Sequence, residues 1–230
     1  MADNTQNKRT LIILPAYNEE GKIGRVVTKI RATGVPCDIV VVDDCSTDNT
    51  RQEALDAGAE VITHRTNSGV GAGIRTGMKF GLDRGYTLGV VMSGDDQHEP
   101  SELPRALEPI TSGEFDFIQG SRYMPGGQVI NERTFRLITT KWYSRFFSLL
   151  SGAHITDATN GFRSFKFDVL RDPTINLDQE WLSGYELEPY FLYKVVTGKR
   201  WRFKEVPITV RYHAVGRDYT KMRPIRDWWR

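Results

Sequence analysis

The order of apolar and amphipathic segments constrains the fold more than any other feature of this sequence. Short apolar runs typical of buried strands begin near residues 11, 38, 60, 88 and 115. Segments with apolar residues on one helical face lie between them, and the first of these helices is expected to begin in Glu19 and Glu20. Because strands alternate with helices, the sheet should be largely parallel with right-handed crossovers. We therefore expect an α/β fold with a mainly parallel central sheet flanked by helices.

The pattern changes after residue 123. A polar, glycine-containing loop precedes a predicted helix over residues 134–150, which carries a broad stripe of aromatic and aliphatic residues. A short strand, a helix and another strand follow. The sequence contains no internal repeat or linker, so we predict a single domain over residues 1–230. Its expected parts are a flexible N-terminus (1–9), a first half (10–122), a second half (123–213) and a basic C-terminal extension (214–230).

Composition excludes several classes of protein. The formal net charge of +2 is too small to favour a nucleic-acid partner, so none is expected. The two cysteines, Cys37 and Cys45, lack the spacing of a zinc site or a disulfide framework. The polar N-terminus and the absence of 18 consecutive apolar residues predict neither a signal peptide nor a spanning helix.

The apolar run that begins at residue 88 ends abruptly in polar residues, Ser93, Gly94, Asp95, Asp96 and Gln97. A buried strand with this ending places oxygen ligands at the carboxyl edge of a parallel sheet, where open α/β folds bind ligands. Carboxylate and amide oxygens suit a hard divalent cation such as Mg²⁺ or Mn²⁺. The alternative is that these carboxylates cap the next helix or lie in solvent. Nearby His98 is expected to be structural.

Two more carboxylates, Asp43 and Asp44, end a neighbouring predicted strand. The four acidic side chains could then converge on one crevice, provided that cations or hydrogen-bond donors lie nearby. Asp44 is the better candidate for contacts with a nucleotide, because Asp48 and Asp43 could instead cap a turn.

Glycines open the helix that follows residue 68, at positions Gly69, Gly71 and Gly73. They match a dinucleotide-binding fingerprint only loosely, since that motif belongs to the first strand-to-helix turn. We interpret them as positions where the helix packs closely on the sheet beside the site.

Cationic residues gather in the later half of the chain: Arg122, Arg133, Arg136, Arg163 and Lys221. Arg136 and Thr140 are four residues apart and share a helix face, so they could present a guanidinium and a hydroxyl to one phosphate. The alternative for any single arginine is a solvated surface charge.

Eight motifs occur in a fixed order: ILPAYNEE, VVDDCSTDNT, NSGVGAG, MSGDDQHEP, GSRYMPGG, DATNGFR, GYELE and EVPITV. With them the chain resembles the family 2 glycosyltransferases of GT-A fold over residues 10–222, and within these the dolichyl- or polyprenyl-phosphate mannose or glucose synthases. The family that it resembles is inverting and metal-dependent. On this resemblance, residues 10–122 form the nucleotide-sugar-binding half and residues 123–213 the acceptor-binding half.

The resemblance also implies a role for individual residues. The nucleotide sugar would be held by Pro15, Ala16, Tyr17, Glu19, Val42, Asp44, Ser93, Gly94 and Asp95. The metal would be bound by Asp95 and Gln97, and phosphate groups by Arg122, Arg136, Thr140 and Lys221. Asp95, Arg122 and Arg136 would be the catalytic residues.

One departure from the family concerns the metal. The usual Asp-x-Asp is replaced by Ser93-Gly94-Asp95, so the first carboxylate is missing. Asp96 is an extra acid at a position that is usually apolar, and it either compensates or does nothing. Weak metal affinity or a different metal selectivity is one expectation.

The expected reaction transfers a hexose, mannose from GDP-mannose first and glucose from UDP-glucose second, to a polyprenyl or dolichyl phosphate. The acceptor phosphate is already an anion, so it needs no dedicated base once cations hold it in line. One alternative is transfer to a saccharide hydroxyl in surface-polysaccharide assembly, with Asp157 as the base to test. Another is a nucleotide-sugar-binding partner of a membrane subunit with weak activity.

Access to a lipid acceptor requires contact with a membrane. The helix 134–150 and the terminal residues Ile225, Trp228, Trp229 and Arg230 could seat the protein on the cytoplasmic face of a bilayer as a peripheral protein. The alternative for the helix is that its stripe belongs to the core.

Overall fold

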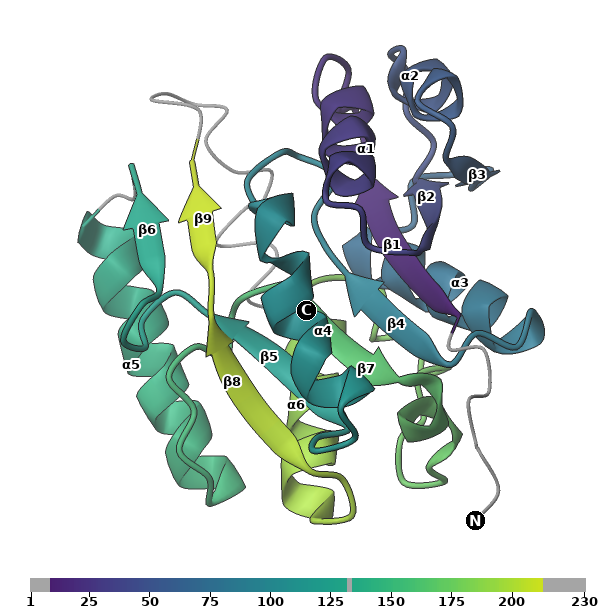
Figure 1. Cartoon of the computed structure of the whole chain (residues 1–230). Coiled ribbons are helices and arrows are strands. Elements are labelled where there is room, and N and C mark those ends of the chain that lie inside the picture. Colours follow the sequence, from purple (N-terminus) through teal and green to yellow (C-terminus); the bar gives the residue numbers. More distant parts are fainter. Residues whose placement is uncertain (1–8, 132–133, 213–230) are drawn as a thin grey trace.

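The computed structural model describes residues 9–131 and 134–212, and within them a seven-stranded sheet forms the centre (Figure 1). Its strand order is β3-β2-β1-β4-β7-β5-β8. The strands are β1 (Thr10–Ala16), β2 (Asp38–Asp43), β3 (Glu60–Thr63), β4 (Leu88–Val91), β5 (Phe117–Ser121), β7 (Arg163–Lys166) and β8 (Phe203–Pro207). A two-stranded parallel sheet pairs β6 (Gln128–Ile130) with β9 (Thr209–Arg211).

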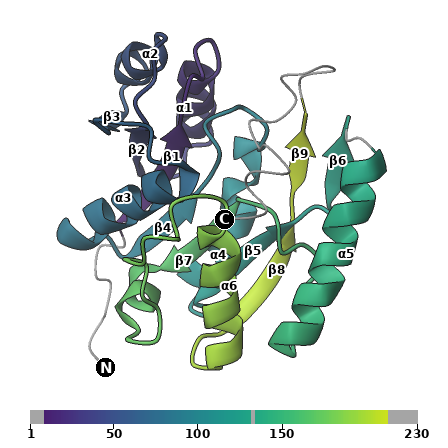
Figure 2. The ribbon, with the colours of Figure 1, turned by 180° about the vertical axis from the view of Figure 1, so that it is seen from behind.

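Helices cover both faces of the central sheet (Figure 2). One face is covered by α1 (Ile23–Ala32), α2 (Thr50–Asp56), the short 3-10 helix η1 (Pro100–Glu102) and α4 (Leu103–Thr111). The other is covered by α3 (Val70–Asp83), the 3-10 helix η2 (Phe167–Arg171) and α6 (Leu187–Gly198). Because side chains alternate along a strand, Ile12 and Leu14 of β1 enter the first core and Leu11 and Ile13 the second. Both cores are therefore built on the same strands.

The predicted α/β fold with a mainly parallel sheet is confirmed, with one exception in the middle. The strand β7 runs antiparallel to both β4 and β5, between which it lies. Since β4 and β5 are both antiparallel to β7, they run in the same direction as each other and as β1 and β2. The carboxyl ends of β1, β2, β4 and β5 consequently share one edge of the sheet.

The first helix begins at Ile23, and the prediction that it begins in Glu19 and Glu20 was wrong. Residues 19–21 instead form a turn whose backbone N–H groups donate across to the second strand–helix unit. Their acceptors are Thr50 Oγ1 at 2.6 Å, Asp48 Oδ2 at 3.1 Å and the Glu53 carboxylate at 2.8 Å. These side chains hold residues 19–21 in a turn, and Gly21, with a φ of 74°, lies outside the right-handed helical region.

Close packing holds α3 against the sheet. A Cβ added at Gly77 would lie 2.3 Å from Ile13 Cγ2, and one at Gly73 would lie 3.3 Å from Pro15 Cβ. The interpretation of Gly73 as a helix-to-sheet contact agrees with this geometry. Gly69 and Gly71 differ, because they pack against the backbone of residues 182–184 in the later half of the chain. Only glycine permits so close an approach.

The helix α5 (Thr134–Ser151) stands apart at the edge of the molecule (left in Figure 1). Only Ser144 and Phe147 are buried along it, and Phe147 alone joins a hydrophobic core. No helix within the described ranges has the length and apolar character needed to cross a membrane.

Candidate active site

The residues predicted to bind the donor lie at the shared carboxyl edge of the sheet. Tyr17 follows β1, Asp44 follows β2, Asp95 follows β4 and Arg122 follows β5. The first two segments are joined directly, since the Asp44 N–H donates to the Ala16 carbonyl at 2.8 Å. Sheet direction therefore brings together four segments that lie far apart in the sequence.

Asp44 is buried and its carboxylate anchors the start of α3. Oδ1 accepts from Ser68 N at 2.8 Å and lies 2.7 Å from His64 Nδ1, while Oδ2 accepts from Gly69 N at 2.8 Å. The other nitrogen of His64 is 2.9 Å from Thr76 Oγ1 on α3. Any role of Asp44 toward a nucleotide would add to this structural role. No sequence signal indicated that His64 is its partner.

Asp43 has a different environment. Its Oδ1 accepts from Ser46 N at 3.1 Å, which is the turn-capping role considered for it. The side chain is 1% exposed, so it does not face solvent at the edge of the sheet.

The loop after β4 presents Asp95 and Gln97. Asp95 Oδ1 accepts from Gln97 N at 3.1 Å, which closes a tight local turn, and the Gln97 carbonyl accepts from Arg211 N at 2.8 Å. Among the residues that the structure describes, no cation forms an ion pair with Asp95. One partly exposed carboxylate and a neighbouring amide fit a hard divalent cation whose remaining ligands are substrate phosphates and water. The described part of the chain contains no cluster of three or more acidic, histidine or cysteine side chains arranged as a metal site.

Asp96 turns away from Asp95 and pairs with α1. Its Oδ1 lies 2.7 Å from Lys29 Nζ and its Oδ2 lies 3.4 Å from Arg25 Nε, with the residue 6% exposed. The four carboxylates after β2 and β4 therefore serve separate partners, and the hypothesis that they converge on one crevice was wrong. Strand ends fix where these side chains start but not which neighbour each one faces.

His98 lies at the C-terminal end of the same loop and hydrogen-bonds to its start. Its Nδ1 accepts from Ser93 N at 3.0 Å, and its Nε2 lies 3.0 Å from Asn160 Oδ1. Burial lowers the pKa of His98 from 6.5 to about 4, so the ring is neutral at pH 7. A neutral ring that accepts at one nitrogen and donates at the other has the structural role expected for it.

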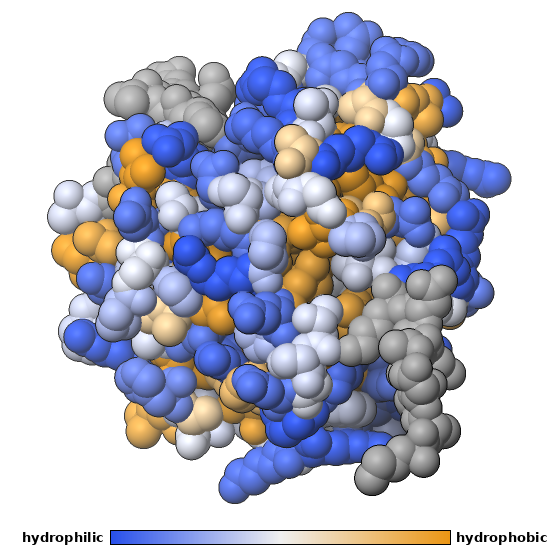
Figure 3. Space-filling model, viewed as in Figure 1, coloured by the Kyte–Doolittle hydropathy of each residue, from blue (hydrophilic) through white to orange (hydrophobic). Residues whose placement is uncertain are grey.

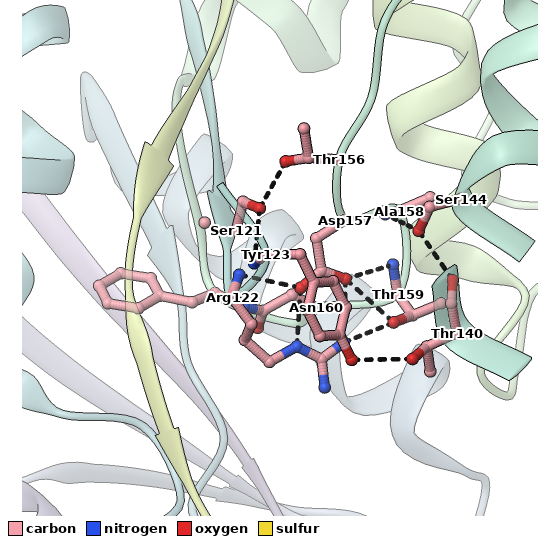
Figure 4. Close-up of polar contacts among 12 residues, drawn as sticks. Ser121, Arg122, Tyr123, Thr140, Ser144, Thr156, Asp157, Ala158, Thr159 and Asn160 are labelled. Atoms are coloured by element: carbon pink, nitrogen blue, oxygen red, sulfur yellow. Dashed lines mark hydrogen bonds and ion pairs between the residues drawn. The ribbon is translucent and has the colours of Figure 1, made fainter. Parts of the chain in front are cut away.

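Arg122 forms a buried ion pair with Asp157 (Figure 4). Its Nε donates to Asp157 Oδ2 at 2.7 Å and its Nη2 to Oδ1 at 2.9 Å, and Asp157 is fully buried. The Arg122 guanidinium also donates to Tyr212 Oη at 2.7 Å and to Thr159 Oγ1 at 2.6 Å. Proximity to the Asp157 carboxylate raises the pKa of Arg122 against the opposing effect of burial. This guanidinium is largely committed within the chain, and its predicted contact with a phosphate stays a prediction.

Arg136 and Thr140 lie on α5 close to the Arg122 cluster. The Thr140 hydroxyl donates to the Arg136 carbonyl at 2.8 Å and shares a 2.8 Å hydrogen bond with the Tyr123 hydroxyl. The Arg136 guanidinium carbon is 4.9 Å from the centroid of the Tyr212 ring. Tyr212 thus contacts both arginines, a role that no sequence signal indicated. Arg133 and Lys221 lie outside the described residues.

The outer face of α5 is apolar and exposed, and Figure 3 shows hydrophobic residues at the surface along this edge of the molecule. The exposed side chains are Phe135, Ile138, Trp142, Tyr143, Phe146, Leu149 and Leu150. Arg136, Lys141 and Arg145 are interspersed among them, and α5 contains no acidic residue. The alternative that this stripe belongs to the core holds only for Phe147.

Known proteins are similar to this chain in sequence and in fold. The profile of Glycosyl transferase family 2 matches residues 11–172. The chain is 34% identical to an undecaprenyl-phosphate mannosyltransferase of Micrococcus luteus, over 90% of this chain and 86% of that protein. It is also 34% identical to a polyprenol monophosphomannose synthase of Mycolicibacterium smegmatis, over 91% of this chain and 80% of that protein.

Among solved structures, a glucosyl-3-phosphoglycerate synthase from Mycobacterium tuberculosis, in complex with Mn²⁺, UDP and phosphoglyceric acid, superposes with a TM-score of 0.69. It covers 96% of this chain and 73% of its own, and at 18% identity it supports the GT-A fold alone. The profile match and the two relatives are sufficient to assign the family. The chain is an enzyme that belongs to glycosyl transferase family 2, and it resembles the dolichyl-phosphate mannosyltransferases within that family.

Proposed function

We propose that this glycosyltransferase moves mannose from GDP-mannose to a polyprenyl phosphate with inversion at the anomeric carbon. The observation that carries the proposal is the 34% identity, over nine-tenths of the chain, to two proteins named for mannose transfer to polyprenyl phosphates. Glucose from UDP-glucose is the second candidate donor.

The donor would lie at the carboxyl edge of β1, β2 and β4. Asp95 and Gln97 would hold Mg²⁺ or Mn²⁺, and the bound metal would supply positive charge to the departing diphosphate. The nucleotide would contact the ends of β1 and β2 and the loop after β4, at Pro15, Ala16, Tyr17, Glu19, Val42, Asp44, Ser93 and Gly94. Cationic side chains in the later half would offset the remaining repulsion between donor and acceptor.

The acceptor phosphate would lie near Arg136 and Thr140. Arg136 is the better candidate for direct contact, since Arg122 is already bonded to Asp157, Thr159 and Tyr212. Arg122 would then act chiefly through Tyr212, against which the Arg136 guanidinium lies, and Lys221 would add a further cation. A phosphate oxygen is ionised at neutral pH, so the attack requires orientation and no proton removal.

Transfer to a saccharide hydroxyl would require a general base, and the structure disfavours the candidate named for it. Asp157 is fully buried and its carboxylate faces the Arg122 guanidinium. Such a carboxylate has no access to a sugar hydroxyl. The choice of a phosphate acceptor thus rests on geometry as well as on the relatives.

The exposed face of α5 would rest on the cytoplasmic face of a membrane that contains anionic lipids. Its aromatic and aliphatic side chains would enter the interface while Arg136, Lys141 and Arg145 face phosphate headgroups. This arrangement would place the Arg136 end of α5 next to the phosphate of a lipid acceptor. The terminal Ile225, Trp228, Trp229 and Arg230 lie outside the described residues.

The direct test is transfer of labelled sugar. We expect the full chain, incubated with labelled GDP-mannose, polyprenyl phosphate and Mg²⁺ or Mn²⁺, to produce a lipid-extractable labelled product. Asp95→Asn should lower the rate by at least about a hundredfold through weaker metal binding. The same change at exposed Asp168, which pairs only with Arg171 among the described residues, should have no effect. Absence of lipid-linked sugar from the wild type with every donor would overturn the proposal.

A second assay separates the two acceptor classes. Arg136→Ala should raise the KM for polyprenyl phosphate about tenfold or more, because a charge-assisted contact is lost, and leave the affinity for GDP unchanged. Arg171→Ala, another surface arginine, serves as the control. Unchanged kinetics in Arg136→Ala would favour a saccharide hydroxyl. GDP binding without turnover would favour a partner subunit.

A further inference from the structure

The loop that carries Asp95 and Gln97 is connected to α1 through Asp96. The Asp96 carboxylate contacts Lys29 Nζ at 2.7 Å and Arg25 Nε at 3.4 Å. These two cations are four residues apart on one face of α1, so a single side chain bridges one turn of that helix. The carboxylate is 4% exposed, whereas Lys29 and Arg25 are about half exposed. A buried carboxylate thus attaches the loop to partly exposed cations of α1.

The backbone at Asp96 is held in the left-handed region, with φ of 63°. Aspartate tolerates this conformation better than most residues, but it persists only where surrounding contacts favour it. The conformation reverses the chain between Asp95 and Gln97, whose N–H donates to Asp95 Oδ1 at 3.1 Å. The direction of Asp96 toward α1 is therefore coupled to the direction in which Asp95 and Gln97 are presented.

Other contacts leave the loop little room to adapt. A Cβ at Gly94 would lie 3.0 Å from Ile23 Cδ1 of α1 and 3.1 Å from the Pro15 carbonyl. His98 fastens the far end of the loop to Asn160. Between these two attachments, Asp96 connects the loop to α1 through its ion pairs.

We infer that Asp96 is a positioning residue for divalent-cation binding, which fixes Asp95 and Gln97 through its ion pairs with Lys29 and Arg25. This role explains the extra acid without adding a ligand, because the charge of Asp96 is already met by two cations. With only one carboxylate left to hold the metal, a fixed loop conformation carries more of the affinity than in a site with two. The inference rests on the metal-dependent reaction proposed above.

Mn²⁺ affinity, measured by electron paramagnetic resonance with saturating GDP, is the test. Asp96→Gly permits the same φ and removes the tether, so we expect Mn²⁺ affinity to fall about tenfold or more, as for other residues that support metal ligands. Asp96→Asn keeps one acceptor and should fall between the wild type and Asp96→Gly. GDP affinity without metal should stay unchanged in both variants.

Substitution of the two partner residues distinguishes a positioning role of Asp96 from a ligand role, because the two roles predict opposite changes in Mn²⁺ affinity. If Asp96 positions the loop, the double variant Arg25→Gln/Lys29→Gln weakens Mn²⁺ binding by a similar factor. If Asp96 is itself a ligand held back by these cations, the same double variant tightens Mn²⁺ binding and overturns the inference.

Arg31→Gln provides the matched control in the last turn of α1. Arg31 donates to the carbonyls of Ala57 and Gly58 and does not contact the loop. Arg31→Gln should lower the melting temperature and leave Mn²⁺ affinity unchanged. If Asp96→Gly likewise lowers the melting temperature and leaves Mn²⁺ affinity unchanged, Asp96 has only a structural role and the inference is overturned. Lack of Mn²⁺ binding by the wild type with GDP or UDP would also overturn the inference, whereas sugar transfer is decided by its own assay.

Discussion

Two long helices of this enzyme are attached to the fold in different ways. Along α3, Ile74 and Met78 are buried and Gly77 lies directly against Ile13 of β1. Along α5, apolar side chains such as Leu149, which is 80% exposed, point outward. The helix beside the proposed donor is thus fixed by close packing, and the helix beside the proposed acceptor leaves its apolar face uncovered.

The inner face of α5 is attached by the buried side chain of Phe147 and by hydrogen bonds. Ser144 Oγ accepts from Ala158 N at 3.1 Å, and Ser148 Oγ accepts from Ile155 N at 3.0 Å. Both contacts hold the turn that also carries Asp157. An ordinary surface helix buries most of its apolar residues, whereas α5 buries Phe147 and leaves most of the others exposed. The contrast with α3 is consistent with the membrane-facing role that is proposed for α5.

The largest expected effect tests the turn under α5. Asp157→Asn should lower the free energy of unfolding by about 3–5 kcal/mol, because Arg122 would be left buried without a counter-charge. Urea denaturation followed by circular dichroism measures it, with Asp168→Asn as the exposed control. A loss below about 1 kcal/mol would show that the pair contributes little to the attachment of α5.

The next effect tests close packing at α3. Gly77→Ala should cost about 1–3 kcal/mol, since its Cβ would meet Ile13 Cγ2 at 2.3 Å in a packed core. Gly198→Ala at the end of α6 is the matched control, because nothing lies within 4 Å of its added Cβ. Equal urea midpoints for the two variants would remove the distinction between α3 and α5.

A smaller effect is expected on the inner face of α5. Ser144→Ala should cost about 1 kcal/mol, because the buried N–H of Ala158 would lose its acceptor. Ser151→Ala should be close to neutral, because the Ser151 hydroxyl makes a single 3.4 Å contact, to the Ser148 carbonyl, among the residues that the structure describes. If both substitutions were neutral in urea denaturation, hydrogen bonds would not be what attaches α5.

The smallest effect on stability is expected on the outer face. Leu149→Ser should change the free energy of unfolding by less than about 0.5 kcal/mol, since the side chain is already 80% exposed. Co-sedimentation with anionic vesicles should nevertheless fall about tenfold, the loss expected when one leucine no longer leaves water. Leu55→Ser on α2 is the control for vesicle binding. Equal vesicle binding by both variants would contradict a membrane-facing α5.

Much of the first half of the chain, residues 10–122, was predictable from local patterns. Apolar runs and helical periodicity indicated the elements from β1 to β5, and abrupt strand ends indicated Asp44 and Asp95. These features are readable because strand and helix periods depend on neighbouring residues, and because parallel strands end at a common edge. The start of α1 was missed, since side chains from α2 and its entry loop, distant in sequence, hold residues 19–21 in a turn.

The sequence by itself thus determined the fold class, the edge of the sheet that carries the candidate site, and the loop that presents Asp95. Only the tertiary structure decided that β7 runs antiparallel, that Arg122 pairs with Asp157 35 residues away, and that Asp96 faces Lys29 67 residues away. The reason is that the partner of a buried charge depends on which distant segments pack beside it. Which segments pack together depends on the whole chain and cannot be inferred from local periodicity.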